Sequence, residues 1–155
     1  QFAFLRDNGI TTRTDMAAFT ARTEETLANL MKQRTVLNVR RKRRRALYTA
    51  LADAEALAPV KELYEAGLSG METEFAQYMD AVAALEQCGV PREGLIQEKA
   101  ELYDRLAELN RQIRAERRKL ALCRKTQNSL PRMEQEIDKA EARESEVRTN
   151  EHRRR

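Results

Sequence analysis

The segment from Gly94 to Leu130, GLIQEKAELYDRLAELNRQIRAERRKLALCRKTQNSL, decides the fold of this chain. Its apolar side chains recur at alternating steps of mostly three and four residues, with charged side chains between them: Leu102, Leu106, Leu109, Ile113, Leu120, Cys123 and Leu130. This spacing places them on one narrow stripe of a helix. A continuous helix of this length extends about 55 Å and cannot bury the stripe against itself, so it needs a partner helix.

The expected partner lies earlier in the same chain, from Thr12 to about Leu57. Its apolar residues keep a helical spacing, and no Gly or Pro interrupts it before Pro59. In heptad terms, the later segment has one core position at Leu102, Leu109, Glu116, Cys123 and Leu130, and the other at Leu106, Ile113, Leu120 and Gln127. The sequence therefore predicts an all-α fold, a long antiparallel, coiled-coil-like helical hairpin with a small helical cap at the turn.

Gly and Pro residues mark the expected helix boundaries. Residues 1–8 are typical of the last turn of a helix that ends before Gly9, and Thr12 with Asp15 resembles a capping box. Pro59 is expected to begin a cap of two short helices. Pro131 is expected to split the returning arm, and residues beyond about 142 are expected to fray. These boundaries predict one domain with four parts, 1–57, 58–90, 91–130 and 131–155.

The composition favours an extended helical protein over a thick globular core. Charged residues make up 35% of the chain and hydrophobic ones 41%, and there is no Trp. No apolar run approaches the roughly 18 residues that span a bilayer, so no membrane association is expected. The chain begins with Gln1 and shows no signal peptide, so we expect a piece of a larger protein. Cys88 and Cys123 lack metal-ligand spacing and are expected to be reduced thiols in a cytoplasmic protein.

No constellation of residues suggests catalysis. The only histidine is His152, and there is no glycine-rich phosphate loop and no pair of carboxylates set among apolar neighbours. We therefore expect no catalytic residue, no metal site and no cofactor in this chain. The four tyrosines are expected to be packing residues where the arms meet the cap: Tyr48, Tyr64, Tyr78 and Tyr103.

The charge is distributed unevenly along the chain. Residues 1–57 contain eleven Lys and Arg against six Asp and Glu, residues 58–110 contain four against eleven, and residues 111–155 contain fourteen against eight. A basic–acidic–basic pattern is typical of nucleic-acid contact, and it also fits arms that neutralise each other on folding.

The run RRKRRR at positions 40–45 is the strongest sign of a polyanion partner. Such cations follow the phosphates of DNA or RNA without reading sequence. The alternative is a solvated helix face whose cations are partly paired across the hairpin, with Glu101, Asp104 and Glu108 as the expected partners. Because consecutive residues encircle a helix, about three or more of the six cations should remain in solvent in either case. A second basic stretch, Arg111–Lys125, is a further candidate for DNA contact. The alternative is that its cations are the charged residues that flank a coiled-coil seam. The predicted DNA-binding residues are Arg40, Arg41, Lys42, Arg43, Arg44, Arg45, Arg114, Arg117, Arg118 and Lys119.

The order of these features resembles a known family. FLRDNGI leads into a capped long helix and a basic run, and ALAPVKELYEAG leads into the cap and the leucine-rich return. This order is similar to the C-terminal region of MobA/VirD2-type relaxases, the mobilization proteins of mobilizable plasmids and integrative conjugative elements. The resemblance covers nearly the whole chain and is best over Phe4–Ile10, Ala56–Gly67 and Gln97–Lys125.

The resemblance implies a parent enzyme that nicks the transfer origin with a tyrosine and binds a metal through histidines in its N-terminal domain; neither has a counterpart here. For this chain it implies a non-catalytic module that binds transfer-origin or single-stranded DNA, or docks a relaxosome accessory protein or the coupling protein. The alternative is a structural interaction or dimerisation module without nucleic-acid binding, including a coiled-coil segment of an unrelated cytoskeletal or phage protein. Both a monomer and a coiled-coil dimer are compatible with the sequence.

Overall fold

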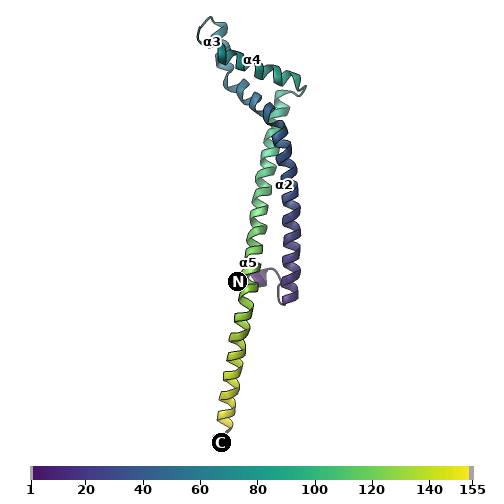
Figure 1. Ribbon diagram of the computed structural model, residues 1–155, viewed down its shortest axis with the longest axis vertical. Coiled ribbons are helices and arrows are strands. Elements are labelled where there is room, and N and C mark those ends of the chain that lie inside the picture. Colours follow the sequence, from purple (N-terminus) through teal and green to yellow (C-terminus); the bar gives the residue numbers. More distant parts are fainter. Residues whose placement is uncertain (1, 154–155) are drawn as a thin grey trace. The chain divides into compact units, whose positions relative to one another are not determined.

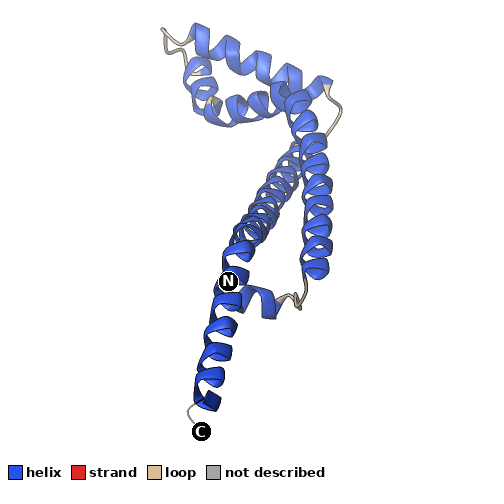
Figure 2. Ribbon diagram, turned by 60° about the horizontal axis from the view of Figure 1, so that its bottom comes forward, coloured by secondary structure: helices blue, strands red, loops and turns tan. Residues whose placement is uncertain are grey.

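The computed structural model describes residues 2–153, and all regular structure in that range is helical (Figures 1 and 2). Helices α2 and α5 pack against each other as an antiparallel pair: Tyr48 of α2 contacts Glu98 of α5, whereas the earlier Gln33 contacts the later Arg105. The prediction of an all-α antiparallel helical hairpin is confirmed. The helices are α1 (Phe2–Asp7), α2 (Arg13–Ala56), α3 (Ala58–Glu65), α4 (Glu72–Gln87) and α5 (Arg92–Arg153).

The chain divides into two compact units. Gln1–Ala28 and Arg114–Arg155 form the first, which we call the terminal unit, and Asn29–Ile113 forms the second, which we call the central unit. Each unit therefore contains one part of α2 and one part of α5, and each has its own buried residues.

In the terminal unit, a reciprocal capping box begins α2, as the sequence predicts. The Thr12 hydroxyl accepts a hydrogen bond from the Asp15 backbone N–H at 3.0 Å. The Asp15 carboxylate accepts the backbone N–H groups of Thr11 and Thr12 at 3.1 and 2.9 Å, and the Thr11 hydroxyl at 2.8 Å. The bonds from Thr11, followed by those from Thr12, lower the pKa of Asp15 from 3.8 to about 2, because they favour the charged carboxylate.

The core of the terminal unit joins α1, α2 and α5. Ile10, Met16 and Cys123 are buried together, with Phe4 and Phe19 packed against them. The two phenylalanine rings meet edge to face, with centroids 5.7 Å apart. The chain can reverse after α1 because the following glycine, Gly9, adopts φ 63°, and the Ile10 N–H donates to the Leu5 carbonyl at 2.9 Å.

Helix α5 runs unbroken through Pro131 as far as Arg153, so the prediction of a split at Pro131 is wrong. Pro131 removes one ladder hydrogen bond, to Gln127, and both residues are exposed, so the freed carbonyl can bind water. The residues that follow are mainly Glu, Ala and Arg, which are strong helix formers. Side chains from 134 to 149 are nonetheless exposed.

The buried stripe of α5 follows the predicted heptads for most of its length. Leu102, Leu106, Leu109, Ile113, Leu120 and Cys123 are all buried. The prediction fails at Gln127, which is exposed, whereas the preceding Thr126 is buried and its hydroxyl donates to the Leu122 carbonyl at 2.8 Å. The buried stripe therefore departs from the predicted heptad by one residue at this point of α5.

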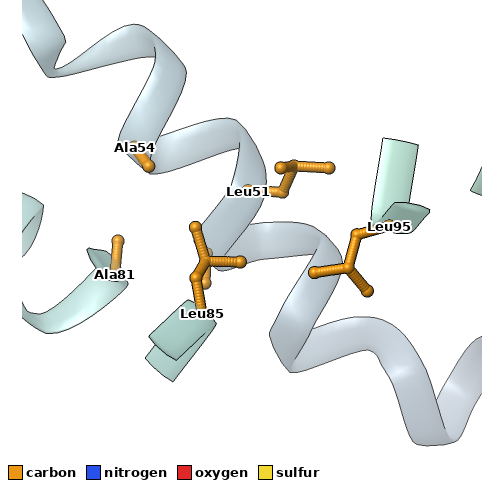
Figure 3. Packing of buried hydrophobic residues seen from close by; sticks show 6 residues of the cluster. Leu51, Ala54, Ala81, Leu85 and Leu95 are labelled. Carbon is orange, nitrogen blue, oxygen red and sulfur yellow. The ribbon is translucent and has the colours of Figure 1, made fainter. Parts of the chain in front are cut away.

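In the central unit, α2, α4 and α5 share one apolar cluster (Figure 3). Leu51, Leu85 and Leu95 contribute one side chain each from the three helices and point toward one another. Ala54 of α2 and Ala81 of α4 are buried in the same cluster. The cap is further held by Tyr64 of α3 and Phe75 of α4, whose rings are stacked with centroids 4.1 Å apart.

Leu95 and Ile96 offer a matched test of this cluster, because Leu95 is 0% exposed and its neighbour Ile96 is 54% exposed. Leu95→Ala is expected to lower the free energy of unfolding by about 2–5 kcal/mol through lost burial and a residual cavity. Ile96→Ala is expected to change it by no more than about 0.5 kcal/mol. Urea unfolding followed by circular dichroism measures both. Equal losses would contradict this packing.

The capping box makes the stability of the terminal unit depend on pH. Because the folded pKa of Asp15 lies below its unfolded value, its contribution is complete above about pH 4 and is lost as the pH falls toward about 2. Asp15→Ala is therefore expected to be less stable than the wild type at pH 7, by a difference that shrinks between pH 4 and pH 2. Denaturant unfolding at several pH values measures this. A difference independent of pH would contradict the assigned hydrogen bonds.

Candidate nucleic-acid interface

The basic run at 40–45 encircles α2 within the central unit. Arg44 is half-buried, while the other five cations are exposed, as expected for consecutive residues on a helix: Arg40, Arg41, Lys42, Arg43 and Arg45. The run therefore divides between the α2–α5 seam and the solvent.

On the seam side, three residues of α2 converge on one carboxylate of α5. Arg44 Nε lies 3.1 Å from Glu98 Oε1, the Tyr48 hydroxyl donates to the same oxygen at 2.9 Å, and Arg40 Nη2 lies 3.9 Å from it. The Glu98 side chain is 17% exposed, so these contacts are shielded from water. Arg40, Arg44 and Tyr48 can all reach it because residues four apart lie on one face of a helix.

The prediction that Glu101, Asp104 and Glu108 pair with the basic run is therefore wrong. Glu101 and Asp104 are exposed and make no ion pair with the run among the described residues. Glu108 instead accepts hydrogen bonds from Arg111 of its own helix. These bonds, followed by the hydrogen bond from Gln112, lower the pKa of Glu108 to about 2. The predicted facing of residues near 48 and 99 is correct, but the acidic residue turned toward α2 there is Glu98.

Burial and the hydrogen bond to Glu98 raise the pKa of Tyr48 above its usual value of 10. The phenol therefore stays protonated and remains a hydrogen-bond donor throughout the physiological range. This bond fixes the tyrosine ring at the seam, where the ring packs with Leu102 and Leu106 and also borders a surface groove.

That groove lies on the surface of the central unit, between α2 and α5, and encloses about 700 Å³. We call it the basic groove. Four of its lining residues are cations, two are tyrosines and none is acidic. The residues from α2 recur every three or four positions, so one face of that helix supplies them. The complete lining is Asn38, Arg41, Lys42, Arg45, Tyr48, Thr49, Ala52, Lys99 and Tyr103.

Lys99 and Tyr103 form the α5 side of the basic groove. The Lys99 ammonium lies 5.9 Å from the centroid of the Tyr48 ring and 6.0 Å from that of Tyr103, within the range of cation–π attraction. The Tyr103 side chain is 45% exposed, so the prediction that it is a packing residue is wrong, whereas Tyr48 and Tyr78 are buried as predicted. Lys99 also lines the groove, although it is not among the residues predicted from the sequence. Its signal was the i, i+4 spacing of Lys99 and Tyr103 opposite Tyr48.

A second, shallower depression of about 570 Å³ lies between α2 and α4 and shares Lys42 and Arg45 with the basic groove. Asp53 and Asp80 also line it. Its mixed charge makes it less suitable for a polyanion than the basic groove.

The second predicted set of cations belongs to the terminal unit, and the basic groove is formed without it. Arg114, Arg117 and Arg118 are exposed. Lys119 is half-buried and donates to Glu116 at 2.8 Å, in keeping with a flanking charge of the α2–α5 seam. The side chain of His152 lies outside the described residues.

Within residues 2–153 there is no group of three or more His, Cys, Asp and Glu residues that could hold a metal ion, and Cys88 and Cys123 are free thiols. None of the helices in this range combines the length and the apolar character needed to cross a bilayer. No protein-family model, curated protein or solved structure matches the chain.

Arg44 and Arg43 are adjacent cations with different surroundings, since only Arg44 is bound to Glu98. Arg44→Ala is expected to lower the free energy of unfolding by about 1–2 kcal/mol, because it removes a charged hydrogen bond from a shielded carboxylate. Arg43→Ala is expected to change it by no more than about 0.5 kcal/mol. Thermal and urea unfolding of both variants measure the difference. Equal effects would contradict the assigned role of Glu98.

Proposed function

We propose that this chain is a non-catalytic helical module that binds DNA through the basic groove. The observation that carries the proposal is a concave surface lined by Arg41, Lys42, Arg45 and Lys99 without any carboxylate. Such a surface attracts a phosphate backbone and gains affinity by releasing the counterions condensed on it. This mode of binding depends steeply on salt and little on base sequence.

The polar contacts at the seam determine which cations take part. Glu98 partly neutralises Arg40 and Arg44 and holds them at the helix interface. Arg41, Lys42 and Arg45 remain exposed on the groove side of α2. Arginine binds a phosphate through two parallel hydrogen bonds, whereas lysine binds as a point charge, so Arg41 and Arg45 should make the most directional contacts.

The resemblance to relaxases suggests where such a module works. We propose that it belongs to a DNA relaxase of a mobilizable or conjugative element, acts in the cytoplasm and binds DNA at or near the transfer origin. The nicking tyrosine and the metal-binding histidines would then lie in another domain, and this chain would need no cofactor. Docking of a relaxosome accessory protein or of the coupling protein is a compatible additional role.

A second candidate is a structural interaction or dimerisation module that does not bind nucleic acid. The end of α5 favours it, because Ile137 and Val147 are 55% and 58% exposed on a helix whose side chains from 134 to 149 are all exposed. A coiled-coil partner would cover such residues. Sedimentation equilibrium distinguishes a monomer from a dimer, and DNA affinity distinguishes the two functions.

The combined variant Arg41→Gln, Lys42→Gln and Arg45→Gln tests the groove. It is expected to weaken binding to a fluorescent DNA oligonucleotide by about tenfold or more at low salt, and to reduce the slope of log affinity against log salt by about two to three. Fluorescence anisotropy at several salt concentrations measures both quantities.

The matched control removes the same number of exposed cations from the end of α5, as Lys139→Gln, Arg143→Gln and Arg148→Gln. It should retain most of the affinity. If the two triple variants lose affinity equally, the groove is not the contact. If the wild-type protein has no affinity even at low salt, the chain does not bind DNA and the interaction module becomes the better account.

A further inference from the structure

Tyr103 is the feature of the basic groove that phosphate binding leaves unexplained. Its side chain is 45% exposed, although the large apolar ring of a tyrosine would gain free energy from burial in a helical seam. The exposed Tyr64 differs, because its ring is stacked on Phe75. The neighbour of Tyr103 is the Lys99 ammonium, 6.0 Å from the ring centroid. The groove therefore presents an aromatic ring beside several cations and no carboxylate.

We infer that the basic groove binds an unpaired nucleotide, with its base stacked on Tyr103 and its phosphates held by Lys99 and the cations of α2. This inference rests on the proposed function. It adds that Tyr103 is the residue through which the groove prefers a single strand to a duplex. Base–aromatic stacking combined with a basic groove is the way proteins bind single strands with little sequence preference.

Duplex DNA fits the same observations less well. In a duplex the base faces are covered by neighbouring base pairs, so only phosphates, sugars and base edges are available to the protein. Tyr103 would then gain nothing from lying in the groove. A single strand offers the unstacked base face and the phosphate together.

The position of Lys99 would allow a single nucleotide to contact both the Tyr103 ring and the cations of the groove. Its ammonium lies about equally far from two tyrosine rings, 5.9 Å from the centroid of Tyr48 and 6.0 Å from that of Tyr103. Tyr48 is held by Glu98 and is 5% exposed, so Tyr103 is the ring that is open to a base. The flexible lysine side chain can move from the rings to a phosphate without disturbing the seam.

The test uses the full chain and four probes. A thymidine oligonucleotide of about 12 nucleotides, its uridine counterpart, a duplex of the same length and a strand of abasic sites with the same phosphates are compared by fluorescence anisotropy. The abasic strand keeps the backbone charge but offers no base to stack on. The thymidine and uridine strands show whether the site distinguishes DNA from RNA.

Tyr103→Leu is expected to weaken binding of the thymidine strand at least about fivefold and to leave the abasic strand and the duplex within about twofold of the wild type. Tyr103→Phe keeps the ring face and should retain wild-type affinity. Tyr64→Leu is the matched control, because it removes an exposed tyrosine outside the groove. Circular dichroism confirms that each variant is folded.

Photo-crosslinking of the unmodified protein to a strand containing 5-iodouracil gives a readout that does not depend on a variant. A crosslink at Tyr103 supports the inference, and crosslinks that exclude Tyr103 overturn it. Equal affinity of Tyr103→Leu and wild type for the thymidine strand also overturns it. The combined Arg41→Gln, Lys42→Gln and Arg45→Gln variant then separates two failures. If it binds the strand poorly while Tyr103→Leu binds normally, phosphate binding by the groove stands and only the stacking is wrong. If it also binds normally, the proposed function itself is wrong.

Discussion

The contact of three α2 side chains with the Glu98 carboxylate is the interaction on which the rest of the central unit depends. Apolar seams allow two long helices to slide past one another by a heptad at modest cost, whereas a shielded charge has few acceptable partners. Arg40, Arg44 and Tyr48 satisfy Glu98 in one register only. We interpret this polar layer as a device that fixes alignment, with a smaller contribution to stability.

This register also shapes the basic groove. With Tyr48 opposite Glu98, the next residue of α5, Lys99, lies over the Tyr48 ring, and Tyr103 follows one turn later. Two cations of the run are taken up at the seam, and the remaining exposed ones face either the groove or bulk solvent. The same set of contacts thus aligns the helices and sorts the basic run into a neutralised part and an available part.

Much of this arrangement follows from the sequence, because it depends on local rules. The capping box at Thr12, the glycine after α1 and the leucine stripe of α5 each encode their structure within a few residues. The error at Pro131 arose because one missing hydrogen bond on an exposed face is a smaller cost than ending a helix of good helix formers. The acidic partner of the basic run was predicted incorrectly because several acidic residues lie on α5. Which of them faces α2 depends on the rotation of α5 about its axis, and the number and order of charges in the sequence do not determine that rotation. Tyr103 was predicted to be a packing residue for the same reason, since spacing alone does not show which tyrosine faces outward.

The most direct test of this account is a map of amide chemical-shift changes in isotopically labelled protein during titration with a short single strand of DNA. The account predicts that the largest changes cluster on both sides of the basic groove, around Arg41 and Arg45 of α2 and around Lys99 and Tyr103 of α5. Changes confined to the region from Arg114 to Lys119, or no changes at all at low salt, would contradict it.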